Sequence, residues 1–291
     1  MIHRRQDSSP MEKRELLLGH SPDSDDAFMF YGLATRKLRS RLITFRHELH
    51  DIETLNRCAL EGKFDVSAIS FHAYPYLAGH YRLLSTGGSM GDGYGPLVVS
   101  DHLFRPEELK GKKVAVPGLL TTAWLVLKLF QPNVEPVVVP FDRVFQAMRD
   151  GHADAALVIH EGQLTFDREG LHRIADLGRW WHQQCNLPLP LGGLVVARRL
   201  PADIQKEAAK LVRRSIEYAM EHREEALAYA MQFARDIEQP LAEKFIGMYV
   251  NEYSLDCGER GRQAIQRLFT LGYQAGVIPN SVEADFLSRE G

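Results

Sequence analysis

The chain has 291 residues, a formal net charge of −3 and a pI of about 6.5. Hydrophobic residues make up 45% and charged residues 25% of it, the composition of a soluble globular protein long enough to bury a core without disulfides or a metal. This charge balance gives no electrostatic footprint for nucleic acid or for an anionic membrane, so neither is predicted as a partner.

Strand-like and helical runs alternate from residue 15 to about residue 200. We predict strands over residues 15–19, 42–49, 65–70, 81–88, 95–100, 112–117, 135–140, 154–160 and 192–199. Helices are predicted between them over residues 25–38, 51–62, 71–79, 121–130, 141–151 and 179–185. This alternation favours an α/β fold with largely parallel sheets.

After Pro201 the pattern becomes purely helical. Apolar residues recur at three- and four-residue spacing over 204–222, 223–235, 240–253 and 257–276. Two extended runs, "GPLVVS" and "GGLVVAR", flank a middle block with its own strand–helix rhythm. We therefore predict two lobes joined by two crossing strands: lobe 1 from residues 15–98 and 196–291, and lobe 2 from residues 99–195. Ligands are expected between the lobes, at strand C-termini and helix N-termini.

Cysteine usage and the N-terminus bear on the compartment. Cys58, Cys185 and Cys257 are far apart and odd in number, which favours a reducing environment. The apolar run at residues 16–18 is too short for a signal-peptide core, and no run of 18 apolar residues occurs. We predict a cytoplasmic protein without a metal site or a membrane segment. The sequence leaves the oligomeric state open.

The turn "VPGLLTTAW" is the first candidate binding element. A strand ends at Pro117, and Thr121 and Thr122 stand where the next helix begins. Unpaired backbone N–H groups and two hydroxyls at a helix start suit a carboxylate or a phosphate. The same threonines also suit a plain N-cap.

The turn "SPDSDDAFMF" has the same strand-to-helix form. Ser21, Asp25 and Asp26 would reach the cleft if this turn lines it, but acidic residues also simply stabilise the positive end of a helix. Ser70 ends the strand "DVSAIS", and it is a further candidate ligand-binding residue. The glycine-rich run "STGGSMGDGYG", with Gly91 in it, predicts either a close backbone approach to the ligand or a mobile loop.

His160 ends the predicted strand in "ALVIHEGQLTF", and Glu161 follows it. If they continue the strand, their side chains point to opposite faces. A lone histidine is commonly structural, but this one ends the strand at the edge where parallel sheets place their sites. Any catalysis there would be acid–base chemistry by an imidazole.

Eight sequence motifs follow one another along the chain in the order of a known protein family. They are "GHSPDSDDAFMFYGL", "DIETLNRCALEGKFDVSAISFHAY", "LLSTGGSMGDGYGPLVV", "VAVPGLLTTAWLVL", "ALVIHEGQLTF", "DLGRWW", "LPLPLGGLVVARR" and "YVNEYSLDCGERG". Together they resemble the 1,4-dihydroxy-6-naphthoate synthase family of the futalosine route to menaquinone. The resemblance covers residues 15 to about 275, and "TTA", "LVIHE" and "LPLPLG" are its most specific parts.

The resemblance implies a type II periplasmic-binding-protein-like fold used as an enzyme. The family is a carbon–carbon lyase that converts cyclic dehypoxanthinyl futalosine, a carboxylate, into 1,4-dihydroxy-6-naphthoate and a small sugar-derived fragment. It implies no cofactor and no metal. By the same resemblance His160 is the base, and Thr121, Thr122 and Ser70 line the ligand cleft. Ser21, Asp26 and Gly91 complete the predicted substrate-binding set.

One turn departs from the family pattern. After Ser-Pro the family has Cys and then an Asn-Asp-Thr run, whereas this chain has Asp23, Asp25, Asp26 and Ala27 at those positions. An amide becomes a carboxylate, which would weaken the binding of an anion unless it faces solvent, and the substrate would then be a relative of the expected one. Two other functions stay open at this point: a chorismate dehydratase of the same pathway, and a non-catalytic small-molecule-binding protein.

Overall fold

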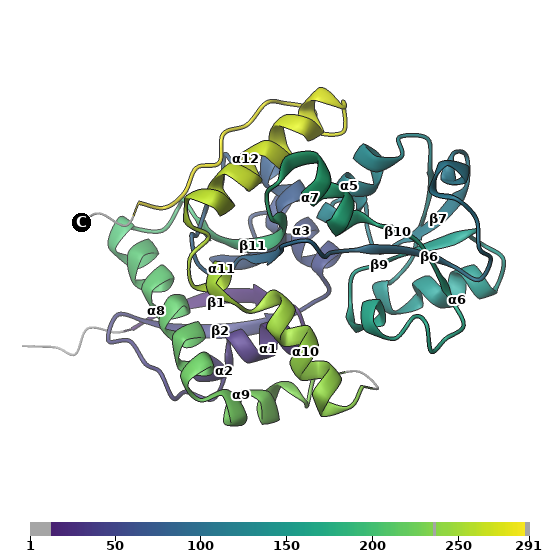
Figure 1. Ribbon diagram of the computed structural model, residues 1–291. Coiled ribbons are helices and arrows are strands. Elements are labelled where there is room, and N and C mark those ends of the chain that lie inside the picture. Colours follow the sequence, from purple (N-terminus) through teal and green to yellow (C-terminus); the bar gives the residue numbers. More distant parts are fainter. Residues whose placement is uncertain (1–12, 235–236, 289–291) are drawn as a thin grey trace, which may run out of the picture.

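The structure is a computed structural model that describes residues 13–234 and 237–288. Two β-sheets, each with its own helices, form two lobes that lie side by side (Figure 1). The predicted two-lobed α/β architecture is confirmed. Of the span predicted as the second part of lobe 1, residues 235–236 and 289–291 lie outside the described residues.

The larger sheet has six strands in the order β2-β1-β3-β11-β4, with β5 also paired to β11. Its strands are β1 (Arg14–His20), β2 (Ile43–Leu49), β3 (Val66–Ser70), β4 (Tyr81–Leu83), β5 (Ser89–Gly91) and β11 (Leu189–Ala197). β1 runs parallel to β2 and β3, so β1 and β3 end at the same edge of the sheet. Ser21 directly follows β1, and Ser70 is the last residue of β3.

The smaller sheet has five strands in the order β10-β6-β9-β7-β8. They are β6 (Leu97–Ser100), β7 (Lys113–Val116), β8 (Glu135–Val138), β9 (Ala155–Val158) and β10 (His172–Asp176). β7 is parallel to β8 and β9. The C-terminal ends of β7 and β9 therefore meet at one edge, where the turns carrying Thr121 and His160 begin.

The strands that lead into and out of the smaller lobe make both sheets mixed. β6 pairs antiparallel with β9 and β10, and β11 pairs antiparallel with β3, β4 and β5. The prediction of largely parallel sheets is therefore wrong, because each crossing strand enters its sheet against the direction set by the strand–helix units. The lobe boundary predicted at residue 195 also falls inside β11, which belongs to the larger sheet from end to end.

The helices are shorter at the N-terminal end of the chain and longer at its C-terminal end. They are α1 (Ser24–Met29), α2 (Tyr31–Ala34), α3 (Ile52–Leu60), α4 (Tyr74–Leu77), α5 (Thr122–Phe130), α6 (Val144–Arg149), α7 (Leu177–Cys185), α8 (Ala202–Glu221), α9 (Arg223–Ala230), α10 (Gln239–Tyr249), α11 (Glu252–Leu255) and α12 (Gly258–Gln274). The predicted C-terminal helical segment is present as α8 to α12. The helix predicted over residues 25–38 is instead broken at Phe30 and ends by Ala34, since Arg36 adopts a left-handed conformation (φ 59°).

Strand alternation divides the buried side chains of the smaller sheet between two cores. Leu97, Val99 and Ala115 face α6 and form a small separate core. Val98 and Val114, on the opposite face, join the large core that α5 and α7 share with the larger sheet. α5 and α7, which come from the middle block, thus share the core of the larger lobe, and this anchors the start of α5 at the boundary between the lobes.

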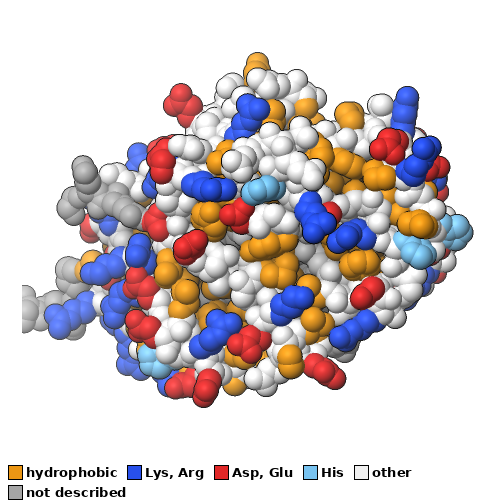
Figure 2. Space-filling model, in the orientation of Figure 1, with side chains coloured by type: hydrophobic (Ala, Val, Ile, Leu, Met, Phe, Trp, Pro, Cys, Tyr) orange, Lys and Arg blue, Asp and Glu red, His pale blue; other side chains and the backbone are white. Residues whose placement is uncertain are grey.

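The molecular surface matches the near-neutral composition. On the face drawn in Figure 2, Lys and Arg side chains are interspersed with Asp and Glu side chains. Within the described residues, none of the helices combines the length and the apolar character needed to cross a bilayer.

Two buried histidines make the free energy of unfolding depend on pH in the acid range. Burial lowers the pKa of His20 to about 3, helped by His47, and lowers that of His72 to about 4. The unfolded chain binds these protons from about pH 6.5 downward and the folded protein does not, so the stability that each neutral histidine contributes is full above pH 6.5 and is lost toward pH 4. Each histidine adds a slope of about 1.4 kcal/mol per pH unit.

The raised pKa values of the Asp25 and Asp26 carboxyls act in the opposite direction, so the test is the difference from the wild type. In urea titrations at pH 7, 6 and 5, His72→Gln should gain stability relative to the wild type as the pH falls, whereas His152→Gln at an exposed site should not.

Candidate active site

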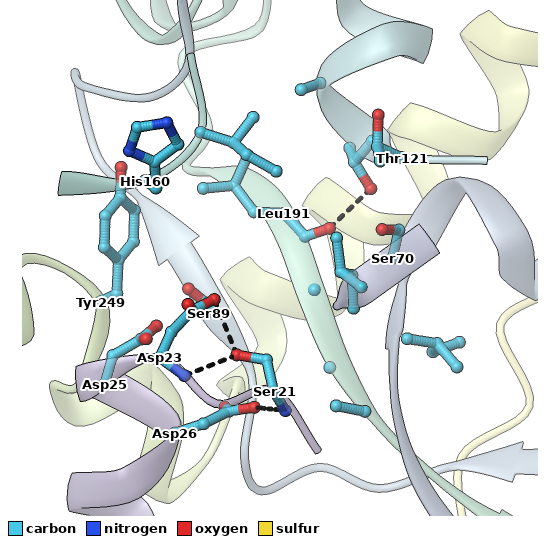
Figure 3. Close-up of a pocket in the computed structure, with 18 of the residues that line it drawn as sticks. Ser21, Asp23, Asp25, Asp26, Ser70, Ser89, Thr121, His160, Leu191 and Tyr249 are labelled. Carbon is cyan, nitrogen blue, oxygen red and sulfur yellow. Dashed lines mark hydrogen bonds between the residues drawn. The ribbon is translucent and has the colours of Figure 1, made fainter. Parts of the chain in front are cut away.

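A cavity of about 140 Å³ lies between the two lobes and takes its walls from both (Figure 3). Six of the seven residues predicted from the sequence line it: Ser21, Asp26, Ser70, Thr121, Thr122 and His160. Residues from four separate turns therefore meet at one place, although up to 139 positions separate them along the chain (160 − 21). His160 and the start of α5 share this cavity.

Gly91 is the predicted residue that the structure does not bring to the cavity. It pairs with Leu189 in the larger sheet, and a β-carbon at Gly91 would lie 2.1 Å from the backbone oxygen of Tyr94. Glycine is needed there for a tight turn. The glycine-rich segment reaches the cavity through Gly87 and Ser89 instead.

The hydroxyls of Thr121 and Thr122, which the sequence offers for ligand binding or for helix capping, form hydrogen bonds that hold the start of α5 in place. Thr121 Oγ1 accepts a hydrogen bond from Trp124 N (3.2 Å) and donates one to Gly118 O (2.9 Å). Thr122 Oγ1 donates to Leu191 O (2.6 Å) and accepts from His72 N (3.1 Å). The hydroxyls thus fix the turn, and the groups left for an anion are the backbone N–H groups of the first turn, which have no intrahelical acceptor.

Helix α3 supports this anion-binding turn from below. Asn56, which is fully buried, accepts a hydrogen bond from Ser70 N (2.8 Å) and donates to Ser70 Oγ (3.1 Å) and Leu120 O (3.4 Å). Glu53 accepts a hydrogen bond from Leu120 N (3.0 Å). Because Ser70 Oγ already accepts a hydrogen bond from Asn56, its own hydrogen can point into the cavity.

His160 lies beyond the end of β9 and is the N-cap residue of a short 3₁₀ helix, η4 (Glu161–Leu164). Its Nδ1 accepts a hydrogen bond from Gly162 N (3.0 Å), and the rings of Phe141 and Phe145 pack around it. A neutral imidazole whose Nδ1 accepts a hydrogen bond carries its proton on Nε2. Proton transfer with a substrate must therefore run through Nε2.

Glu161 does not follow the strand alternation expected for it, because η4 replaces the strand. It is buried and accepts a hydrogen bond from Ser24 Oγ (3.1 Å) in α1. Gln163 of the same turn accepts one from the Tyr249 hydroxyl (2.8 Å) in α10. These two hydrogen bonds join the smaller lobe to the larger one beside the cavity.

The opposite wall of the cavity is acidic. Asp23, Asp25 and Asp26 line it, and Ser21 links two of them: Ser21 Oγ donates to Asp23 Oδ2 (2.8 Å) and Ser21 N donates to Asp26 Oδ2 (2.6 Å) (Figure 3). Burial, with the Asp23 charge, raises the pKa of Asp26 to about 7. Burial and the charges of Asp26, Asp23 and Glu161 raise the pKa of Asp25 well above its usual range.

The acidic wall contains the turn at residues 23–27 that departs from the family pattern, and its surroundings decide how much charge this departure adds. The turn lines the cavity with carboxyls that are partly buried, and the raised pKa values of Asp25 and Asp26 reduce the negative charge that these two add there. Among the described residues, no group of three or more His, Cys, Asp and Glu side chains is placed to hold a metal ion.

Sequence reasoning missed several lining residues. Phe245 and Tyr249 reach the cavity from α10, whose apolar spacing reads as an ordinary core stripe. Leu191 to Gly193, within the motif "LPLPLGGLVVARR", also line the cavity.

Known proteins resemble the chain over most of its length. A family model described as "Menaquinone biosynthesis" matches residues 16–274. A curated 1,4-dihydroxy-6-naphthoate synthase of Thermus thermophilus is 40% identical over 266 residues, 91% of this chain and 97% of that one. A crystal structure of an Archaeoglobus fulgidus protein is 44% identical, with a TM-score of 0.87 over 91% of this chain and 98% of that one.

More distant structures share the fold alone. The alkanesulfonate-binding protein of Xanthomonas axonopodis is 14% identical, with a TM-score of 0.69 over 94% of this chain and 97% of that one. It is a periplasmic-binding-protein relative, which agrees with two lobes that enclose a ligand cavity. The family match over 259 residues (274 − 16 + 1) and the 40% identity to the Thermus thermophilus synthase show that the chain belongs to the menaquinone biosynthesis family.

Proposed function

We propose that the chain is a 1,4-dihydroxy-6-naphthoate synthase that acts on cyclic dehypoxanthinyl futalosine. The observation that carries the proposal is the interlobe cavity, in which the start of α5 and the imidazole of His160 share one enclosed space. The curated relative carries the name of this enzyme rather than that of a chorismate dehydratase, which supports the choice between the two.

The substrate carboxylate would lie at the first turn of α5. Backbone N–H groups there and the Ser70 hydroxyl supply donors, and the helix dipole favours a negative charge. None of the residues described as lining the cavity is a lysine or an arginine, so dipoles rather than an ion pair would hold the anion. This mode of binding orients the ligand without a charged side chain that also attracts other anions.

The reaction requires little catalysis from the protein itself. Ring opening and carbon–carbon cleavage release an aromatic naphthoate, so aromatisation supplies much of the driving force. His160 would remove a hydroxyl proton through Nε2, a contribution of about 10²–10⁴-fold. Base action needs the tautomer with the proton on Nδ1, so the contact with Gly162 N must open before the ring accepts a proton. Closure of the lobes would exclude water and fix the orientation.

The test is direct turnover by the purified full-length protein. Cyclic dehypoxanthinyl futalosine is supplied without added cofactor, and the naphthoate is followed by absorbance and mass. Formation of 1,4-dihydroxy-6-naphthoate supports the proposal. Turnover of chorismate instead, or binding of the futalosine compound without reaction, would contradict it. The cytoplasmic location and the independence from cofactors stay predictions.

A further inference from the structure

The acidic wall poses a question that the proposed function leaves open. An enzyme for a carboxylate substrate has three aspartates in its cavity, and no lysine or arginine is present among the described residues that line it. If the whole wall were ionised, its charge would oppose the entry of an anion into a partly dehydrated space. The wall must therefore lose charge when substrate binds, or hold little charge from the start.

Asp25 is the member of the wall with the most acidic surroundings. Asp23 and Asp26 flank it on α1, and Glu161 faces it from η4 of the other lobe. His160 lies on the η4 side of the cavity, and Tyr249 of α10 extends from beside Asp25 toward His160, where its hydroxyl donates a hydrogen bond to Gln163 (Figure 3). Arg223 of α9 also packs on α1, but it lies over the Phe28 ring and pairs with Glu243.

Contacts between the lobes create this environment. Glu161 and Gln163 reach the larger lobe through hydrogen bonds to Ser24 and Tyr249, and these contacts bring the Glu161 carboxylate to the acidic turn. A carboxyl of the smaller lobe thus joins three carboxyls of the larger one. Crowded carboxyls share protons rather than all ionise, and burial acts in the same direction.

We propose that Asp25 acts as an uncharged carboxylic acid that donates a hydrogen bond to the hydroxyl-bearing, sugar-derived end of the substrate. The inference rests on the proposed function, and it assigns the two ends of the cavity: the carboxylate at the start of α5 and the hydroxyls at the acidic wall. An uncharged carboxyl offers one donor and one acceptor, which suits a hydroxyl group. Asp25 is then a residue that determines specificity and not the base.

Asp25→Asn is the central test, because an amide also offers a donor and an acceptor but cannot ionise. We expect the ratio of kcat/KM of this variant to that of the wild type to be constant at low pH, where both side chains can donate a hydrogen bond. The ratio of variant to wild type should then rise by about tenfold per pH unit above the pKa of Asp25, because only the wild type loses its donor. Groups outside the acidic wall are common to both proteins, so their effects cancel in the ratio, which is measured from pH 5 to pH 10.

Asp203→Asn is the matched control. Asp203 occupies the second position of α8, as Asp25 does in α1, but it is exposed and far from the cavity in the described fold. Its ratio to the wild type should stay flat with pH. A flat ratio for Asp25→Asn as well would overturn the proposal. So would a hundredfold loss at pH 6 in a variant of unchanged Tm, since the ionised form would then be the active one.

A second variant covers the case in which Asp25→Asn does not fold. Glu161→Gln keeps an acceptor for Ser24 but removes a charge that raises the pKa of Asp25. The alkaline fall in kcat/KM should therefore move to lower pH, and an unmoved or upward-shifted limb would contradict the proposal.

An infrared measurement separates this inference from the proposed function. At pH 8 the free wild-type protein should show a band from a protonated carboxyl that Asp25→Asn lacks and Asp203→Asn keeps. If the wild type shows the band but does not turn over cyclic dehypoxanthinyl futalosine, the proposed function fails while the uncharged state of Asp25 stands. If the band is absent, the inference fails whatever the activity.

Discussion

Replacing His160 with alanine is expected to lower kcat by at least about 100-fold and to leave substrate binding nearly unchanged. The imidazole lines the cavity opposite the anion-binding turn, so its loss removes proton transfer but none of the donors proposed to hold the carboxylate. Steady-state kinetics with cyclic dehypoxanthinyl futalosine would give kcat, and calorimetry with the product would give the binding constant.

His160→Gln distinguishes a base from a hydrogen-bond donor. A glutamine amide can donate a hydrogen bond as the Nε2–H tautomer does, but it cannot accept a proton at neutral pH. If His160 is the base, this variant should be as slow as the alanine variant. Wild-type turnover in either variant would remove His160 from the proton transfer. His172→Gln, at an exposed histidine in β10, serves as the control and should leave kcat unchanged.

The sequence allowed the lobes and most of the site to be predicted because both depend on local patterns. Strand–helix alternation marks each unit of the two lobes. The site residues Ser21, Ser70, Thr121 and His160 all lie at or beyond the C-terminal ends of strands, and parallel pairing brings these ends to one edge of each sheet. The direction of β6 and β11 was not predictable in this way. Whether a crossing strand pairs antiparallel depends on the path of the chain between the two lobes. The hydrophobic periodicity of the sequence does not indicate this path.

The remaining site residues depend on tertiary contacts that no local pattern encodes. Tyr249 belongs to a helix whose apolar spacing looks like core, and only its packing against η4 turns it toward the cavity. The glycine-rich context of Gly91 predicts a close backbone approach to a ligand, but the close approach that this glycine allows is to the backbone of Tyr94. Asn56 lies within a predicted helix, where a polar residue reads as a surface position.

Asn56→Asp is expected to weaken the binding of carboxylate ligands by about 10- to 100-fold, because it damages the anion site from behind. In the wild type the Asn56 amide donates to Ser70 Oγ and Leu120 O. A carboxylate cannot donate, so the Ser70 hydroxyl would turn toward the introduced carboxylate and be lost to the ligand. A hydrogen bond to a charged group contributes about 1.5–3 kcal/mol, which corresponds to this range of affinity.

The comparison of two ligands tests the cause of the loss. The naphthoate product carries the carboxylate, whereas its methyl ester does not, so calorimetry should show a large loss for the acid and a small one for the ester. Asn133→Asp adds the same charge at an exposed position and should affect neither ligand. Ser70→Ala removes only the donor and should reproduce part of the loss at unchanged Tm. Equal losses for acid and ester in Asn56→Asp would place the carboxylate elsewhere in the cavity, since damage to an anion site must depend on the anion.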